Sequence, residues 1–210
     1  MTKENLKKVV YYLNELFPEA KTELYYENDF QLLIAIIMSA QTTDKQVNKI
    51  NKIFFTKFET PLELFNLWEE EIKNHIKTVW LYNSKSKNIY ITSKMLVENY
   101  KSNIPETLIE LIKFPWVWIK TAKVWLSIVK NAPYLAVDTH VHRVLNRLWI
   151  VNTKTPLQTD KKIEKILTSK DLAKLHHTLI MFWRYHCTAR NTKCSVCKLN
   201  SICKYYAVNQ

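Results

Sequence analysis

Glycine is missing from this sequence: none of its 210 residues is glycine, whereas average usage of about 7% would give roughly 15. Long apolar runs are also missing, because the longest, residues 30–40, is interrupted by Gln31 and is about half of the roughly 20 residues that a membrane-spanning helix needs. The first residues, MTKENLKK, lack the apolar stretch of a secretory signal. We therefore expect no membrane partner and a cytoplasmic location of the bacterial type.

Sustained alternation of apolar and polar residues, which is typical of half-buried strands, is absent as well. Apolar residues recur at helical spacing instead, so the sequence predicts an all-α fold without repeats or low-complexity tracts. Several polar residues stand where they would cap the start of a helix. These predicted caps are Asn28, Thr43, Thr60, Asp138 and Thr155. We expect a turn at Asn83 and Ser84 before one helix, and we expect Pro105 to start another.

What the sequence has in excess is positive charge and tryptophan. Its 31 lysines and arginines against 19 acidic residues give a net charge of +12, and it contains 7 tryptophans. A basic chain without a membrane segment favours a nucleic acid as its partner.

One stretch, FPWVWIKTAKVWL at residues 114–126, resembles the centre of a helix-hairpin-helix motif. A short hairpin containing Pro115 separates two segments of helical periodicity, and Lys120 lies at the start of the second. Such hairpins normally carry small residues so that their backbone N–H groups can approach a phosphate. Trp116 and Trp118 stand where glycine is expected.

The four cysteines lie close together near the end of the sequence, in the pattern C-x6-C-x2-C-x5-C. A disulfide framework is disfavoured because the chain has no export signal. A zinc site usually uses two close cysteine pairs, and only one such pair is present. Four thiols on one short loop favour a [4Fe-4S] cluster, with zinc as the less favoured occupant. The candidate ligands are Cys187, Cys194, Cys197 and Cys203.

Over nearly its whole length the sequence resembles the endonuclease III family of helix-hairpin-helix DNA glycosylases. The resemblance rests on residues 32–49, 76–89, 114–126, 135–147 and 184–203. It implies a six-helix domain at 22–132, with the helix-hairpin-helix at about 108–127, and an iron-sulfur domain formed by 1–21 and 133–210. It also implies a DNA-binding cleft between the two domains and a monomer that acts on double-stranded DNA with a damaged or abasic site.

The family's activity is base excision repair, in which a glycosylase removes oxidised pyrimidines and an AP lyase cleaves 3′ to the abasic site by β-elimination. The resemblance implies that Lys120 occupies the position of the family's nucleophile, which forms a Schiff base. It also implies that Asp138 occupies the position of the aspartate that assists this nucleophile. An enzyme that acts on a base must take that base out of the duplex. The resemblance makes Gln41 the residue that fills the resulting gap and Leu81 an apolar wedge beside it.

Further DNA contacts are expected at Trp116 and Trp118 in the hairpin. Three basic residues in or near the cysteine loop are candidate phosphate ligands, namely Arg184, Arg190 and Lys193. Tyr82, Asn83 and Lys85 share the turn of Leu81 and are expected to touch DNA too.

Tryptophan replaces glycine at several positions relative to the family pattern. These positions are 68, 80, 116, 118, 149 and 183. Because tryptophan does not share the access of glycine to positive φ, we expect a strained hairpin. We hypothesise that these tryptophans record a codon that the organism reads as glycine; a glycine-free design is the other explanation. Two other functions stay open, a non-catalytic helix-hairpin-helix DNA-binding module and a relative of the adenine-mismatch glycosylases.

Overall fold

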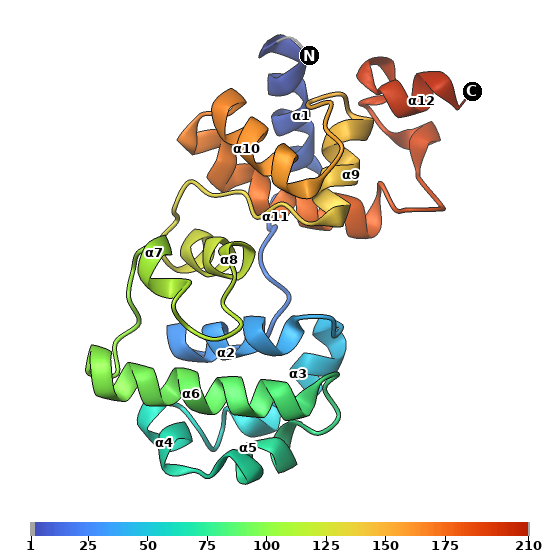
Figure 1. Ribbon diagram of the computed structural model, residues 1–210. Helices are drawn as coiled ribbons and strands as arrows, with labels where there is room; N and C mark the ends of the chain where they lie inside the picture. Colours follow the sequence, from blue (N-terminus) through green and yellow to red (C-terminus); the bar gives the residue numbers. More distant parts are fainter. Residues whose placement is uncertain (1–2, 210) are drawn as a thin grey trace. The chain divides into compact units, whose positions relative to one another are not determined.

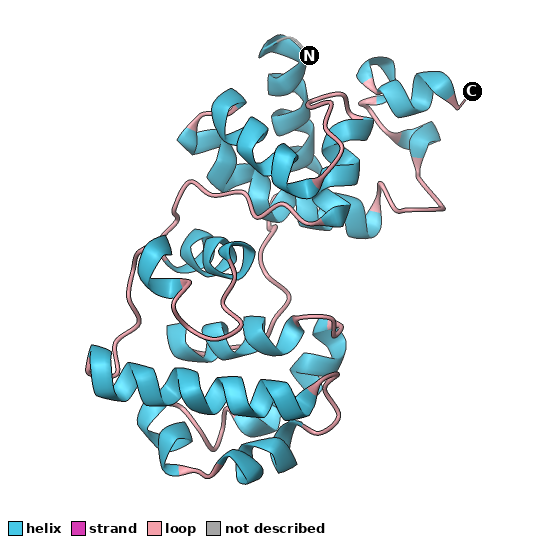
Figure 2. Cartoon of the chain, in the orientation of Figure 1, coloured by secondary structure: helices cyan, strands magenta, loops and turns pink. Residues whose placement is uncertain are grey.

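The computed structural model describes residues 3–209, apart from the side chains at 3, 169–171, 173 and 174. Helices make up the regular structure of this range, which contains no strand (Figures 1 and 2). The predicted all-α class is therefore confirmed. The helices are α1 (Lys3–Leu16), α2 (Asp29–Ser39), α3 (Asp44–Phe54), α4 (Pro61–Asn66), α5 (Glu69–Ile76), α6 (Tyr82–Tyr100), α7 (Leu108–Leu111), α8 (Ile119–Val129), α9 (Thr139–Arg147), α10 (Pro156–Ile166), α11 (Ser169–Tyr185) and α12 (Lys204–Val208).

The chain forms two compact units, each with its own core. One unit, called here the hairpin unit, is Glu23–Lys130. The other, called here the cysteine unit, joins Met1–Thr22 to Asn131–Gln210.

The hairpin unit is built around α2, which is apolar on all sides and buried from Phe30 to Met38. A helix of this kind must be covered on every face, and it packs against α3, α6 and α8. One polar contact fixes α8 onto its start, because the Trp125 Nε1–H donates to the Asp29 carbonyl at 2.9 Å.

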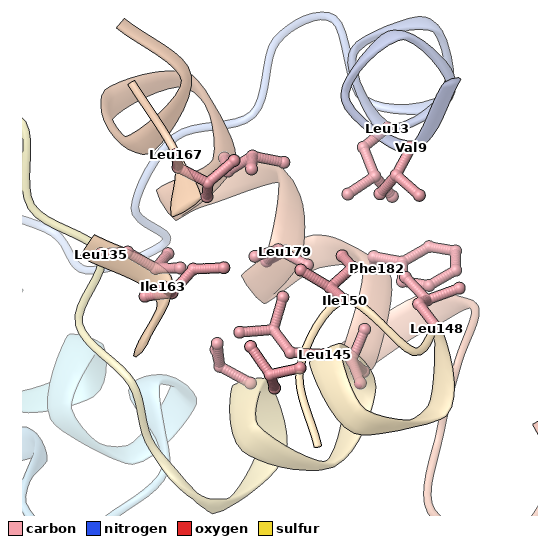
Figure 3. Packing of buried hydrophobic residues seen from close by; sticks show 14 of the residues in the cluster. Val9, Leu13, Leu135, Leu145, Leu148, Ile150, Ile163, Leu167, Leu179 and Phe182 are labelled. Atoms are coloured by element: carbon pink, nitrogen blue, oxygen red, sulfur yellow. The ribbon is translucent and has the colours of Figure 1, made fainter. Parts of the chain in front are cut away.

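The core of the cysteine unit is assembled from segments far apart in the sequence (Figure 3). Leu13 of α1, Leu145 of α9 and Leu179 of α11 are all fully buried in it. Because α1 packs against α11, the N-terminal helix belongs to the same unit as the C-terminal half of the chain.

The predicted helix caps are confirmed, since each of the five side chains accepts a hydrogen bond from a backbone N–H in the first turn of its helix. Two boundaries were predicted wrongly. Asn83 and Ser84 lie inside α6, which begins at Tyr82, and Pro105 lies before α7, which begins after the cap Thr107. None of the described helices combines the length and the apolar character that crossing a membrane requires.

Candidate active site

The predicted hairpin joins α7 to α8 through a tight turn at residues 114–117. The Val117 N–H donates to the Phe114 carbonyl at 3.1 Å, and Pro115 is the second residue of this turn. Trp116, the third residue, has a φ of 62°. A type II turn needs positive φ at its third position, and proline is common at its second. The backbone therefore has the form that normally uses glycine, with a tryptophan in it.

Lys120 is the second residue of α8 and its side chain is exposed. The same helix buries Ala122, Trp125 and Leu126 on its opposite side, which fixes the orientation of α8 on α2. Trp118 caps α8 with extended backbone and no side-chain hydrogen bond, and it is 72% exposed. The structure thus presents Lys120 and Trp118 to solvent at one end of the helix.

Asp138 caps α9 in the cysteine unit. Its Oδ1 accepts hydrogen bonds from the backbone N–H groups of His140 at 2.9 Å and Val141 at 2.8 Å. These bonds hold the carboxylate in one orientation while leaving it half-exposed. Lys120 belongs to the hairpin unit, whereas Asp138 belongs to the cysteine unit.

Gln41 and Leu81 come together around one surface pocket in the hairpin unit. The pocket has a volume of about 610 Å³ and is lined by the turn after α2 and by the segment from Lys77 to Ser84. Both residues have left-handed backbone, with φ of 57° at Gln41 and 58° at Leu81, and both side chains are exposed. Positive φ is uncommon outside glycine, because it costs energy. Where the surrounding structure maintains this conformation in another residue, the position is often part of a functional site.

Lys85, which we expected to touch DNA, is fully buried. Its Nζ donates to the carbonyls of Met38 at 2.8 Å and Ala40 at 2.6 Å, and to the Thr42 hydroxyl at 3.0 Å. Burial lowers the pKa of Lys85 to about 8. The expectation of a DNA contact at this lysine was wrong, because the side chain turns inward to the end of α2.

The cysteine loop between α11 and α12 is held by an arginine of α9. Arg147 donates from Nη1 to the Thr188 carbonyl at 2.7 Å and to Cys187 Sγ at 3.5 Å, and from Nη2 to the Ala189 carbonyl at 3.0 Å. The Arg143 Nη2 adds a bond to the Cys187 carbonyl at 3.1 Å. Sequence reasoning missed both arginines, although their spacing of four residues places them on one face of α9.

None of the four cysteines forms a disulfide bond. Burial raises the pKa of Cys197. Within residues 3–209, no three His, Cys, Asp or Glu side chains already form a group that could hold a metal ion. The donor set itself fits an iron-sulfur cluster, since four thiols on one braced loop can supply one ligand to each iron.

The basic residues predicted near the cysteines lie on or beside this loop. Arg190 and Lys193 are exposed, and Arg184 is half-buried with its guanidinium 5.3 Å from the Trp183 ring centre. Exposed cations on a loop that the arginines of α9 hold in place are suited to contact phosphate groups.

A second tryptophan has a backbone conformation typical of glycine. Trp149 follows α9 with a φ of 57°. The Ile150 N–H donates to the Leu145 carbonyl at 2.9 Å and the Trp149 N–H donates to the Asn146 carbonyl at 3.0 Å. This pair of bonds is a Schellman motif, in which the left-handed residue is usually glycine. Among the described residues, positive φ is not found at the other four tryptophans that replace glycine, at positions 68, 80, 118 and 183.

Comparison with known proteins places this geometry in one superfamily. Residues 34–169 match the model described as HhH-GPD superfamily base excision DNA repair protein. Endonuclease III of Rickettsia conorii is 43% identical over 189 residues, which cover 90% of each chain. Endonuclease III of Bacillus subtilis is 40% identical over 204 residues, which cover 95% of this chain and 93% of the relative.

A solved structure described as a trapped endonuclease III-DNA covalent intermediate has a TM-score of 0.93 and 36% identity to this chain. The alignment covers 100% of this chain and 99% of that one. The chain is thus a helix-hairpin-helix protein of base excision DNA repair. Within that superfamily it belongs to the endonuclease III family of bifunctional DNA glycosylases and AP lyases. The predicted family and enzyme class are confirmed.

Proposed function

We propose that this enzyme removes oxidised pyrimidines from double-stranded DNA and then cleaves 3′ to the abasic site, with Lys120 as its nucleophile. The observation that carries the proposal is an exposed lysine at the start of α8, directly after the hairpin turn. We also propose that it acts as a monomer in the cytoplasm and that it has two domains, one at 22–132 and one formed by 1–21 and 133–210.

The chemistry follows from an amine at that position. The unprotonated Lys120 Nζ bonds to the sugar C1′ while the bond from C1′ to the base breaks, and the base leaves with the bonding electrons and takes up a proton. The adduct nitrogen loses one of its two protons, and its lone pair then breaks the bond from C1′ to the ring oxygen O4′, which takes up a proton. The nitrogen keeps its remaining proton, and the product is an iminium ion, the protonated Schiff base. Removal of a C2′ proton then expels the 3′ phosphate by β-elimination.

Asp138 assists this step through its charge. A carboxylate held by two backbone N–H groups can stabilise the positive charge that develops on the sugar as the base leaves.

Gln41 and Leu81 hold the duplex open. Both side chains are exposed at the rim of one pocket. In this arrangement Gln41 fills the gap left by the extruded base, and Leu81 acts as an apolar wedge beside it. Hairpin contacts from 116 and 118 and loop contacts from Arg184, Arg190 and Lys193 bind the phosphates on either side.

The four cysteines would hold a [4Fe-4S] cluster, one thiolate to each iron. When bound, the cluster would keep the loop folded so that Arg190 and Lys193 stay on its surface. Arg147 and Arg143 support the same loop from α9. A brown protein that absorbs in the visible region would distinguish iron-sulfur from zinc.

Borohydride trapping on a duplex with one abasic site tests the nucleophile. We expect a covalent adduct with the wild-type enzyme and none with Lys120→Ala. Lys94→Ala is the matched control, since Lys94 is an exposed lysine of α6 with an ion-pair partner on its own helix. Retained DNA binding with no wild-type adduct would show a non-catalytic binding module instead.

A further inference from the structure

Lys85 has a position that its chemistry alone does not explain, because a lysine is seldom fully buried without a carboxylate partner. All three of its ammonium protons are used by oxygen acceptors, two of them carbonyls at the C-terminal end of α2. A cation is favoured at that end of a helix. The buried ammonium is therefore a cap for α2 that is supplied by another helix, α6.

The groups that Lys85 binds surround one residue. Ala40 and Thr42 are the two neighbours of Gln41, and the lysine Nζ lies within hydrogen-bond distance of both. The left-handed backbone of Gln41 is thus held from each side.

The main chain of Lys85 acts on the second turn. Its N–H donates to the Leu81 carbonyl at 3.0 Å, which forms the first hydrogen bond of α6 directly after left-handed Leu81. No side chain caps this helix start. One residue therefore connects the backbones of Gln41 and Leu81 across the pocket that both residues line.

We propose that Lys85 is a positioning residue that sets Gln41 and Leu81 in the arrangement needed to enter DNA beside a damaged base. The proposal rests on the proposed function of those two residues. Lys85 itself touches neither the substrate nor the reacting atoms.

A mutant cycle tests this on a duplex whose abasic site lies opposite 2-aminopurine, a base whose fluorescence rises when it is unstacked. The borohydride-trapping rate and the fluorescence are measured for Lys85→Met, for Gln41→Ala/Leu81→Ala and for the combined variant. We expect Lys85→Met to lower the rate by about tenfold or more and to reduce the fluorescence rise, because buried acceptors lose their donors. In the Gln41→Ala/Leu81→Ala background, Lys85→Met should lower the trapping rate by less than about twofold, because the effects of mutations at coupled residues are not additive.

Two further variants keep the test informative if Lys85→Met folds poorly. Thr42→Val removes one acceptor and leaves the lysine in place, so it should give a smaller loss in the same direction. Lys94→Met changes an exposed lysine of the same helix and should leave both signals unchanged.

Equal losses in both backgrounds, or no loss at all, would overturn the role of Lys85 while the wild-type adduct still supports the lyase. Absence of a wild-type adduct would overturn the proposed function and the role of Lys85 together.

Discussion

Trp116 and Trp149 have a backbone conformation that is unfavourable for tryptophan. Both are left-handed, one at a type II-like turn and the other in a Schellman motif. The cost of that conformation for a residue with a Cβ is about 1–2 kcal/mol. The left-handed backbone at 116 and 149 therefore suits glycine better than tryptophan.

A comparison of glycine with alanine isolates the backbone effect from the loss of the indole. At 116 and at 149 we expect the glycine variant to be more stable than the alanine variant by about 1 kcal/mol in urea unfolding followed by circular dichroism. At Lys87, an exposed position inside α6, the order should reverse by about 1 kcal/mol. Alanine variants that are as stable as glycine at both sites would contradict the assignment of strain.

Asp138 has two roles that substitution can separate. Asparagine is as good a helix cap as aspartate but carries no charge, whereas alanine removes the cap at a cost of about 1 kcal/mol. We expect Asp138→Asn to keep the stability and lose at least about tenfold in lyase rate, and Asp138→Ala to lose both. A fully active Asp138→Asn enzyme would reduce this residue to a cap.

At the scale of the helix, sequence reasoning succeeded where the signal was local. A cap such as Asn28 bonds to an N–H only three residues away, so the spacing of side chains was enough to find it. The start of α6 was missed because it follows left-handed Leu81 and has no capping side chain, while Asn83 and Ser84 resemble a turn.

The supporting contacts of the site could not be read from the sequence. Lys85 binds acceptors 43 to 47 residues away, and Arg147 reaches carbonyls 41 and 42 residues away. Only the packing of α6 against α2, and the course of the cysteine loop past α9, bring these groups together. An exposed lysine was the natural expectation because most lysines are exposed.

The contact between α6 and α2 gives a prediction about pH. The folded-state pKa of Lys85 is lowered by burial from its usual 10.5 to about 8, so between these values the unfolded chain binds more protons than the folded one. The free energy of unfolding contributed by this group therefore rises with pH across that window, by at most about 1.4 kcal/mol per pH unit. Denaturation of the wild type and of Lys85→Met at pH 8 to 10.5 measures the difference. Parallel curves would show that Lys85 titrates normally.

At the scale of the whole molecule, the net charge of +12 makes the affinity for DNA depend on salt concentration. Log affinity falls as log salt rises, and each phosphate contact makes this slope more negative by about 0.9. We expect Arg190→Ala and Lys193→Ala each to make that slope less negative by about 1, and Lys7→Ala, at an exposed position in α1, to leave it nearly unchanged. The measurement is a salt titration of binding to an abasic duplex. Unchanged slopes for both loop variants would remove the loop from the interface.

The two units contribute different groups to one proposed reaction, since Lys120 belongs to the hairpin unit and Asp138 to the cysteine unit. The fold class and the family could be predicted because several motifs occur in the family's order along the chain.

The most direct test of the account is to find the amine that bonds to the sugar. The borohydride-reduced adduct with an abasic duplex is digested with protease and mapped by peptide mass spectrometry. The account predicts that the sugar remnant is on the peptide that contains Lys120. A remnant on any other amine of the chain, or on none, would contradict it.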